Sequence, residues 1–181
     1  TDLIEQDQFS GSLLVARDGK VLISKGYGMA NIDLEIPNTP QTKFRLGSIT
    51  KQFTAMAILQ LQQQGKLNVQ NPICLYIQDC PEAWQPITLH HLLTHTSGLY
   101  NYTASSHYTE FKKQFATPIN IIDLFRDLPL EFGPGNRWKY SNSGYIVLGY
   151  IIETVSGQPY ASFLQDNIFN PLQMVNTGYA D

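Results

Sequence analysis

This chain has no long hydrophobic run and no basic run. No stretch approaches the roughly 18 apolar residues that span a membrane. The N-terminus, Thr1-Asp2-Leu3-Ile4-Glu5, lacks the basic and apolar regions of a signal peptide. The 12 Lys and Arg residues are scattered, and the net charge is −3. We therefore expect no membrane span in this chain and no nucleic-acid partner.

Cysteine is scarce, because the chain has only Cys74 and Cys80, with five residues between them. This spacing matches no zinc knuckle. A disulfide in an oxidising compartment and two ordinary, partly buried thiols are both compatible with it. The cysteines alone decide neither the pairing nor the compartment.

Three histidines, His90, His91 and His95, raise the question of a metal. His91 and His95 are four residues apart and could share one face of a helix as ligands. However, Leu92 stands where a zinc-protease helix carries its glutamate, and no third ligand is apparent. We expect no metal and no cofactor, and histidines that form hydrogen bonds to nearby loops.

The 181 residues are 43% apolar and 15% charged, as in an ordinary soluble domain. Residues 9–16 and 21–29 are rich in β-forming residues and flank Asp18-Gly19, which predicts an antiparallel hairpin. Residues 31–43, with two prolines, predict an irregular connection. Residues 48–64 have apolar residues on most sides and predict a largely buried helix that ends near Gly65.

Ser48 and Lys51 are three residues apart where this helix is expected to start, so they share one face of its first turn. The amine can then reach the hydroxyl, and the helix N-terminus favours the negative charge that develops when the hydroxyl attacks. A serine helix cap beside a solvated lysine is the alternative. This stretch alone leaves both open.

Short helices are expected in the rest of the chain. Residues 88–95 begin with the capping residue Thr88, and residues 118–128 form an amphipathic segment. Residues 100–108 predict a surface loop that could overhang a cleft. Residues 145–155 predict a buried helix that ends at Ser156-Gly157, and Pro159 suits the first turn of another helix.

Taken together, these motifs resemble the serine β-lactamase and penicillin-binding-protein superfamily. The similarity is greatest to the branch of class C β-lactamases, D-alanyl-D-alanine peptidases and related esterases. The matching segments are Phe44-Arg45-Leu46-Gly47-Ser48-Ile49-Thr50-Lys51, Leu92-Leu93-Thr94-His95-Thr96-Ser97-Gly98-Leu99, Pro134-Gly135 followed by Tyr140-Ser141-Asn142, and the run from Gly144 to Pro171-Leu172-Gln173-Met174. The resemblance implies an α+β fold, with an antiparallel sheet flanked by helices and a mostly helical lobe. Residues 1–181 would be one incomplete catalytic domain, with 1–65 in the α/β lobe and 66–181 in the helical lobe.

The resemblance assigns a role to each of four residues. Ser48 would be the nucleophile that forms an acyl-enzyme, and Lys51 would deprotonate it or hold the proton network. Tyr140 would transfer protons to the leaving group and from the attacking water, and Asn142 would orient Lys51 and the substrate amide. A weak hydroxyl nucleophile needs such a base and an orienting group. The structural alternatives are a core aromatic for Tyr140 and a helix cap for Asn142.

A third family motif, Lys-Thr-Gly or His-x-Gly, does not occur after Asn142. In the family this motif lies on a strand that supplies one N–H group of the oxyanion hole. We therefore expect the chain to be the N-terminal portion of a larger domain. Alone it should have little or no activity, and the hairpin's unpaired edge could support association or swapping.

The expected function is that of a serine acyl hydrolase acting on β-lactams, D-Ala-terminated peptides or small esters. The alternative is a non-catalytic binding module related to penicillin-binding proteins. An α/β-hydrolase is excluded, because no Gly-x-Ser-x-Gly elbow occurs. The resemblance favours a periplasmic or secreted location, although some esterase relatives are cytoplasmic.

Overall fold

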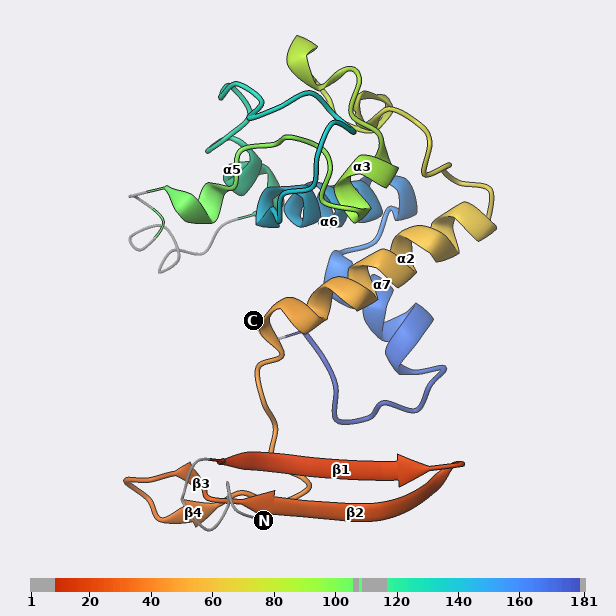
Figure 1. Cartoon of the computed structure of the whole chain (residues 1–181). Coiled ribbons are helices and arrows are strands. Elements are labelled where there is room, and N and C mark those ends of the chain that lie inside the picture. The colour runs from red at the N-terminus through yellow and green to blue at the C-terminus, as the bar shows by residue number, and fades with distance from the viewer. Residues whose placement is uncertain (1–8, 106–107, 109–116, 180–181) are drawn as a thin grey trace. The chain divides into compact units, whose positions relative to one another are not determined.

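The computed structural model describes residues 9–105, 108 and 117–179 (Figure 1). The chain divides into two compact units, Thr1–Leu46 and Gly47–Asp181. Strands occur in the first unit and helices in the second, which agrees with the predicted α+β class. The elements in chain order are β1 (Gly11–Arg17), β2 (Lys20–Tyr27), β3 (Met29–Asn31), β4 (Ile36–Pro37), η1 (Gly47–Thr50), α2 (Lys51–Gln63), η2 (Ile73–Leu75), η3 (Glu82–Trp84), α3 (Leu89–Leu93), η4 (Tyr102–Ala104), α5 (Pro118–Ile122), α6 (Asn142–Ser156), α7 (Tyr160–Leu164) and η5 (Gln165–Phe169).

The predicted hairpin is confirmed, because β1 and β2 pair in antiparallel register. Asp18 and Gly19 both have positive φ at its tip, 50° and 73°, which is the conformation that an Asp-Gly hairpin turn requires. The segment 31–43, predicted to be an irregular connection, contains one short strand, because β4 pairs with β3. Asn38, directly after β4, ties this segment to the end of β2. Its side-chain amide donates to the Tyr27 carbonyl at 2.9 Å, and its backbone N–H donates to the Gly28 carbonyl at 2.9 Å.

The helix predicted at 48–64 forms in two parts, the 3-10 turn η1 and the α-helix α2. Gly65 ends it in a left-handed conformation, and its N–H donates to the Gln62 carbonyl at 2.9 Å. The prediction of a largely buried helix was wrong, because Met56 and Leu59 are 49% and 46% exposed. Within its own unit, α2 packs against α6 and α7 along one face, and that face alone is buried.

Helix α6 is the centre of the second unit and packs against α2, α3, α5 and α7 (Figure 1). It includes the predicted segment 145–155 and ends, as predicted, before Gly157 in the left-handed region. Four of its apolar side chains are fully buried: Val147, Leu148, Ile151 and Ile152. This burial fixes the position of Asn142, the first residue of α6.

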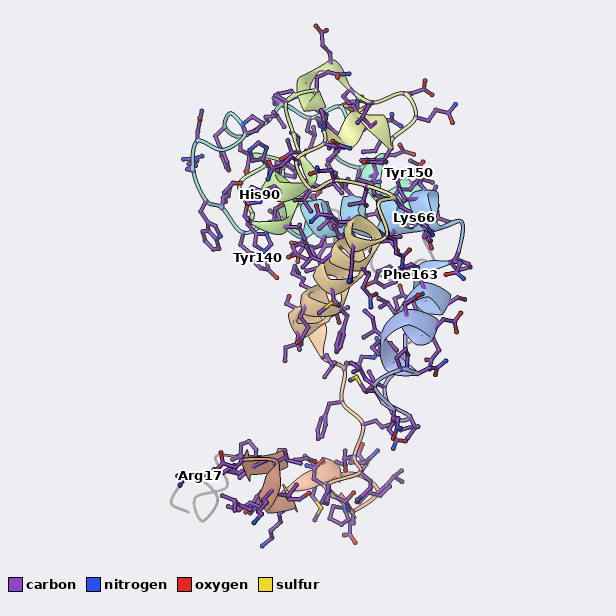
Figure 2. The ribbon with its side chains drawn as sticks, turned by 90° about the vertical axis from the view of Figure 1, so that its right-hand side faces the viewer. Arg17, Lys66, His90, Tyr140, Tyr150 and Phe163 are labelled. Carbon is purple, nitrogen blue, oxygen red and sulfur yellow. A yellow bond between two sulfur atoms is a disulfide. The ribbon has the colours of Figure 1, made fainter. Side chains whose placement is uncertain are left out.

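Shorter elements complete the core around α6. Helix α7 follows Pro159 as expected, and its Phe163 is buried (Figure 2). The amphipathic segment 118–128 is helical only as far as Ile122 and then continues in turns. Trp84 and Phe125 stack at 5.8 Å between ring centroids, and both are buried.

The region before α6 contains His91 and both cysteines, and the structure shows the partners of each. Thr88 caps α3 as predicted: its hydroxyl accepts from the His91 N–H, while its own N–H donates to His91 Nδ1, both at 3.2 Å. His91 is therefore part of a capping box. Cys74 and Cys80 form a disulfide.

No helix in the described part of the chain is both long and apolar enough to cross a membrane.

Candidate active site

Ser48 lies in the 3-10 turn η1, and Lys51 is the first residue of α2. The Lys51 ammonium donates to Ser48 Oγ at 3.3 Å. The three-residue spacing therefore brings the two side chains together at the start of the helix, as the sequence predicted. Within the described residues, Ser48 is exposed.

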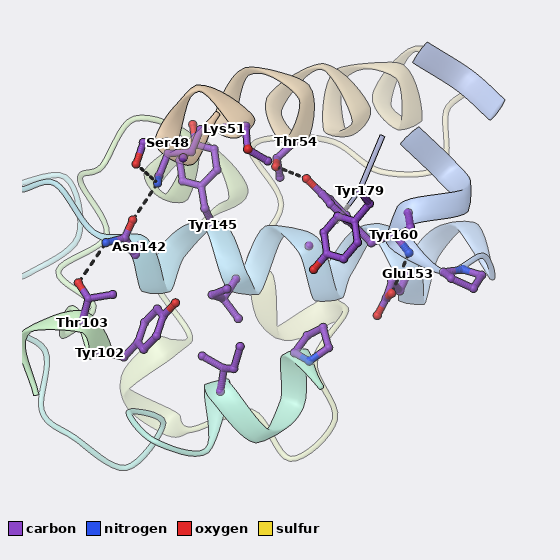
Figure 3. A pocket seen from close by; sticks show the side chains of 18 of the residues that line it. Ser48, Lys51, Thr54, Tyr102, Thr103, Asn142, Tyr145, Glu153, Tyr160 and Tyr179 are labelled. Carbon is purple, nitrogen blue, oxygen red and sulfur yellow. Dashed lines mark hydrogen bonds between the residues drawn. The ribbon is translucent and has the colours of Figure 1, made fainter. Parts of the chain in front are cut away.

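Tyr140 and Asn142 contact the same pair from a distant part of the sequence: Tyr140 lies 92 residues after Ser48, and Asn142 lies 91 residues after Lys51. Figure 3 shows the contact between Asn142 and Lys51. The Tyr140 hydroxyl donates to Ser48 Oγ at 2.7 Å. Asn142 Oδ1 accepts from Lys51 Nζ at 2.8 Å. The structure thus brings all four predicted residues together. Their catalytic roles stay predictions.

The loop before α5 holds Asn142 in place, and sequence reasoning did not single out its residues. The Asn142 side-chain amide donates to Thr103 Oγ1 at 3.1 Å, and its backbone N–H to Asn101 Oδ1 at 3.0 Å. Ser143 Oγ donates to the Tyr100 carbonyl at 2.6 Å. The polar composition of residues 100–108 was the available signal, and it indicated a loop near a cleft without indicating these bonds.

Aromatic rings surround the Lys51 ammonium. Its Nζ lies 4.8 Å from the Tyr140 ring centroid and 5.3 Å from that of Tyr145. Both distances are within the range of a cation–π contact. The Tyr145 hydroxyl donates to the Leu93 carbonyl at 3.1 Å, which fixes this ring against α3.

Opposing effects act on the pKa of Tyr140. Partial burial raises it, but hydrogen bonding with Lys51 and Ser48 and the positive charge of Lys51 together lower it below the ordinary 10.0. Burial, with a smaller contribution from Tyr140, raises the pKa of Tyr145. The surroundings therefore make Tyr140 easier to ionise than a free tyrosine and Tyr145 harder to ionise.

A cavity of about 650 Å³ opens beside these residues (Figure 3). Ser48, Lys51 and Asn142 line one end of it, and Glu153 and Tyr160 line the other. Its volume lies in the range of small-molecule sites. Across the described ranges, no cluster of three or more His, Cys, Asp or Glu side chains is arranged to hold a metal ion.

Comparison with known proteins identifies the family. The family model described as Beta-lactamase matches residues 1–181. The chain belongs to the beta-lactamase family. This is a fold family of serine hydrolases that includes amidases, and the recognition and fold class predicted from the motifs are confirmed.

Three relatives illustrate the similarity. Penicillin-binding protein 4* of Bacillus subtilis (strain 168) is 34% identical over 175 residues, which is 96% of this chain and 38% of that protein. The penicillin binding protein from Bacillus halodurans superposes with a TM-score of 0.87 at 33% identity, over 99% of this chain and 57% of that one. The D-amino acid amidase from Ochrobactrum anthropi gives a TM-score of 0.78 at 29% identity, over 90% of this chain and 44% of that one. The chain spans less than half of the length of the curated relatives it matches.

Proposed function

We propose that this chain carries the nucleophile and the proton-transfer groups of a serine acyl hydrolase. The observation that carries the proposal is the position of Ser48 Oγ between two other groups: it lies 3.3 Å from Lys51 Nζ and 2.7 Å from the Tyr140 hydroxyl. An exposed serine whose oxygen is within hydrogen-bond reach of two proton-transfer groups is the arrangement that nucleophilic catalysis needs.

In the acylation step, Ser48 Oγ attacks the carbonyl carbon of the substrate and its proton passes to the Tyr140 phenolate. The lowered pKa of Tyr140 supports this role, because it increases the fraction of the base form near neutral pH. The bond between the carbonyl carbon and the leaving group then breaks. Tyr140 gives its proton to the departing nitrogen or oxygen, which leaves an ester on Ser48.

In the deacylation step, water attacks this ester and gives its proton to Tyr140. The carbon–Oγ bond breaks, the acid product leaves and Ser48 recovers its proton. Lys51 stabilises the phenolate through its charge, and Asn142 holds Lys51 in place through the 2.8 Å contact. This division of roles gives each of the four residues a separate function.

The substrate is proposed to be an amide or ester of a small carboxylic acid, in the class of β-lactams, D-Ala-terminated peptides or small esters. Two observations support this class. The relatives include proteins named as penicillin-binding proteins and a D-amino acid amidase, and the cavity of about 650 Å³ beside Ser48 is large enough for such acyl groups.

We also propose that this chain is the N-terminal part of a longer hydrolase that works outside the cytoplasm. The first point is supported by length, because the chain spans less than half of the length of its curated relatives. The Cys74–Cys80 disulfide supports the second, because disulfides persist in oxidising compartments. Below, "the full-length protein" means this chain joined to the C-terminal segment that this proposal assigns to it.

The test is steady-state hydrolysis by the full-length protein of three substrates: a chromogenic cephalosporin, a D-Ala-D-Ala peptide and a nitrophenyl ester. We expect at least one to be hydrolysed and Ser48→Ala to abolish that turnover. Ser24→Ala, at an exposed serine of β2, is the matched control and should keep it. A folded full-length protein that hydrolyses none of the three, but binds one of them equally well with and without Ser48→Ala, would indicate a binding module instead.

A further inference from the structure

We propose that His95 is a positioning residue that aims the Tyr140 hydroxyl at Ser48. The effect of His95 on rate rests on the proposed function. The positioning of Tyr140 is argued from the contacts of His95 alone. His95 follows α3 and lies outside the four residues predicted from the sequence. The expectation for it was only a hydrogen bond to a nearby loop.

His95 holds the backbone on both sides of Tyr140. Its carbonyl oxygen accepts from the Lys139 N–H at 2.9 Å, and its Nδ1 accepts from the Ser141 N–H at 3.3 Å. Tyr140 is the residue between these two anchors. A segment fixed at the preceding and the following residue has little freedom to rotate, so the Tyr140 side chain leaves the backbone in one direction.

The unusual backbone of His95 makes both anchors available at once. Its φ is 59°, in the left-handed region that a non-glycine residue seldom adopts. Such a conformation costs about 1–3 kcal/mol and persists only where surrounding contacts hold it. One residue can thereby direct its carbonyl and its ring toward the same facing segment.

The imidazole also packs against the ring that it positions. The centroids of His95 and Tyr140 are 4.6 Å apart with the planes tilted by 36°, and those of His95 and Tyr145 are 5.2 Å apart. The Trp138 ring meets His95 edge-on at 6.1 Å. These contacts limit swinging of the Tyr140 ring away from Ser48, and the 2.7 Å hydroxyl contact is the result.

The hydrogen bond to Ser141 requires that Nδ1 carry no proton, so His95 acts in its neutral form. Burial first, and then the positive charge of Lys51, lower the pKa of His95. The titratable groups that face the ring are Lys51, Tyr140 and Tyr145. With Nδ1 engaged by the backbone and no contact of the ring to Ser48 among the described interactions, His95 acts through Tyr140.

Two substitutions in the full-length protein distinguish the contribution of the aromatic ring of His95 from that of its hydrogen-bond acceptor. His95→Phe keeps an aromatic ring and removes the acceptor, while His95→Asn keeps an acceptor near the Nδ1 position and removes the ring. Each is made alone and together with Tyr140→Phe. His90→Phe, at an exposed histidine of α3, is the matched control and should leave the rate unchanged.

The readout is kcat and KM for two esters with the same acyl group, one with a nitrophenol and one with an alkyl alcohol leaving group. The alkyl alcohol needs a proton from Tyr140 and the nitrophenol hardly does. We expect His95→Phe to lower kcat for the alkyl ester by about 10–100-fold with little change in KM. The nitrophenyl ester should lose less, because Tyr140 acts for it only as the base and not also as the acid for the leaving group. In the Tyr140→Phe background it should have no further effect.

Equal losses for both esters, or losses that add fully to that of Tyr140→Phe, would overturn the proposal. If His95→Phe does not fold, His95→Asn is judged in the same way, by the difference between the two esters and by its additivity with Tyr140→Phe. A crystal structure of either variant decides independently of turnover: the proposal predicts a displaced Tyr140 hydroxyl, and a hydroxyl still bonded to Ser48 Oγ contradicts it. If the unmodified protein shows no turnover dependent on Ser48, the proposed function fails and this crystal structure still tests His95.

Discussion

At the level of single residues, the neighbours of Tyr140 determine the direction in which its pKa is shifted. Burial disfavours its ionisation, but the nearby Lys51 charge and the hydrogen bonds with Lys51 and Ser48 outweigh burial. The pKa of Tyr140 is therefore lowered while the pKa of the adjacent Tyr145 is raised. Two phenols that contact the same ammonium thus have pKa values shifted in opposite directions, and the one that reaches Ser48 is the one whose pKa is lowered.

A tyrosine with a pKa below the ordinary 10.0 should be detectable by its tyrosinate absorbance. We expect a pH titration of the folded protein to show one early-ionising phenol that is absent in Tyr140→Phe and present in the control Tyr150→Phe. The rate of acylation should rise with pH through the same transition. Because the folded pKa lies below the unfolded one, ionisation stabilises the fold above the unfolded pKa, and this contribution disappears as pH falls through the folded pKa. Identical titration curves for all three proteins would contradict the assignment.

A buried side-chain hydrogen bond joins α2 to α7. Thr54 Oγ1 and the Tyr160 hydroxyl lie 2.6 Å apart, and Thr54 is only 4% exposed. Removing one partner leaves the other hydroxyl without its bond in a buried place. This contact therefore stabilises the arrangement that places Ser48 and Lys51 beside α6.

We expect Tyr160→Phe to lower the free energy of unfolding by about 1–3 kcal/mol, the usual cost of an unsatisfied buried hydroxyl. Thr54→Val combined with Tyr160→Phe should cost less than the two single changes added together, because neither hydroxyl is then left alone. Urea denaturation of the full-length protein measures all three variants. Full additivity would show that the two hydroxyls do not depend on each other.

The Cys74–Cys80 disulfide closes a short loop between η2 and η3. The chain-entropy estimate for a loop of this length is about 2 kcal/mol. We expect the double change Cys74→Ser and Cys80→Ser to lower the free energy of unfolding by about this amount, while acylation of Ser48 in the folded protein continues. Unchanged stability, or loss of acylation without unfolding, would contradict a purely stabilising role.

Local signals in the sequence predicted the elements better than their packing. Asp18-Gly19, Thr88 and Gly157 determine a turn, a helix start and a helix end through their own backbone chemistry, and each prediction was confirmed. The burial of α2 was predicted wrongly, because its second apolar face does not pack against the helices of its own unit. Which of two apolar faces is covered depends on tertiary contacts, and periodicity cannot distinguish them.

The same distinction applies to the site. Ser48 and Lys51 are joined by helical spacing, and the Tyr-x-Asn motif supplied their distant partners. Asn101 and Thr103 were missed, and for His95 only a hydrogen bond to a nearby loop was predicted, because these bonds depend on how loops far apart in sequence meet. The disulfide likewise needed the fold, since spacing alone left it open.

At the level of the whole molecule, the four residues predicted for the site, Ser48, Lys51, Tyr140 and Asn142, all lie in the unit Gly47–Asp181. We expect the isolated 181-residue chain to hydrolyse substrates at least about 10²–10³-fold more slowly than the full-length protein, the usual cost of one lost oxyanion donor. The comparison uses matched concentrations of monomeric protein and the substrate that the full-length protein turns over. Rapid hydrolysis by the isolated monomer would contradict this expectation.

The central claim is that Ser48 becomes acylated. The most direct test is mass spectrometry of the full-length protein after reaction with a fluorophosphonate or a penicillin, followed by peptide mapping. We predict one added group per protein, located on Ser48, absent in Ser48→Ala and retained in Ser24→Ala. Labelling at another residue, or no labelling of a folded protein by either reagent, would contradict the account.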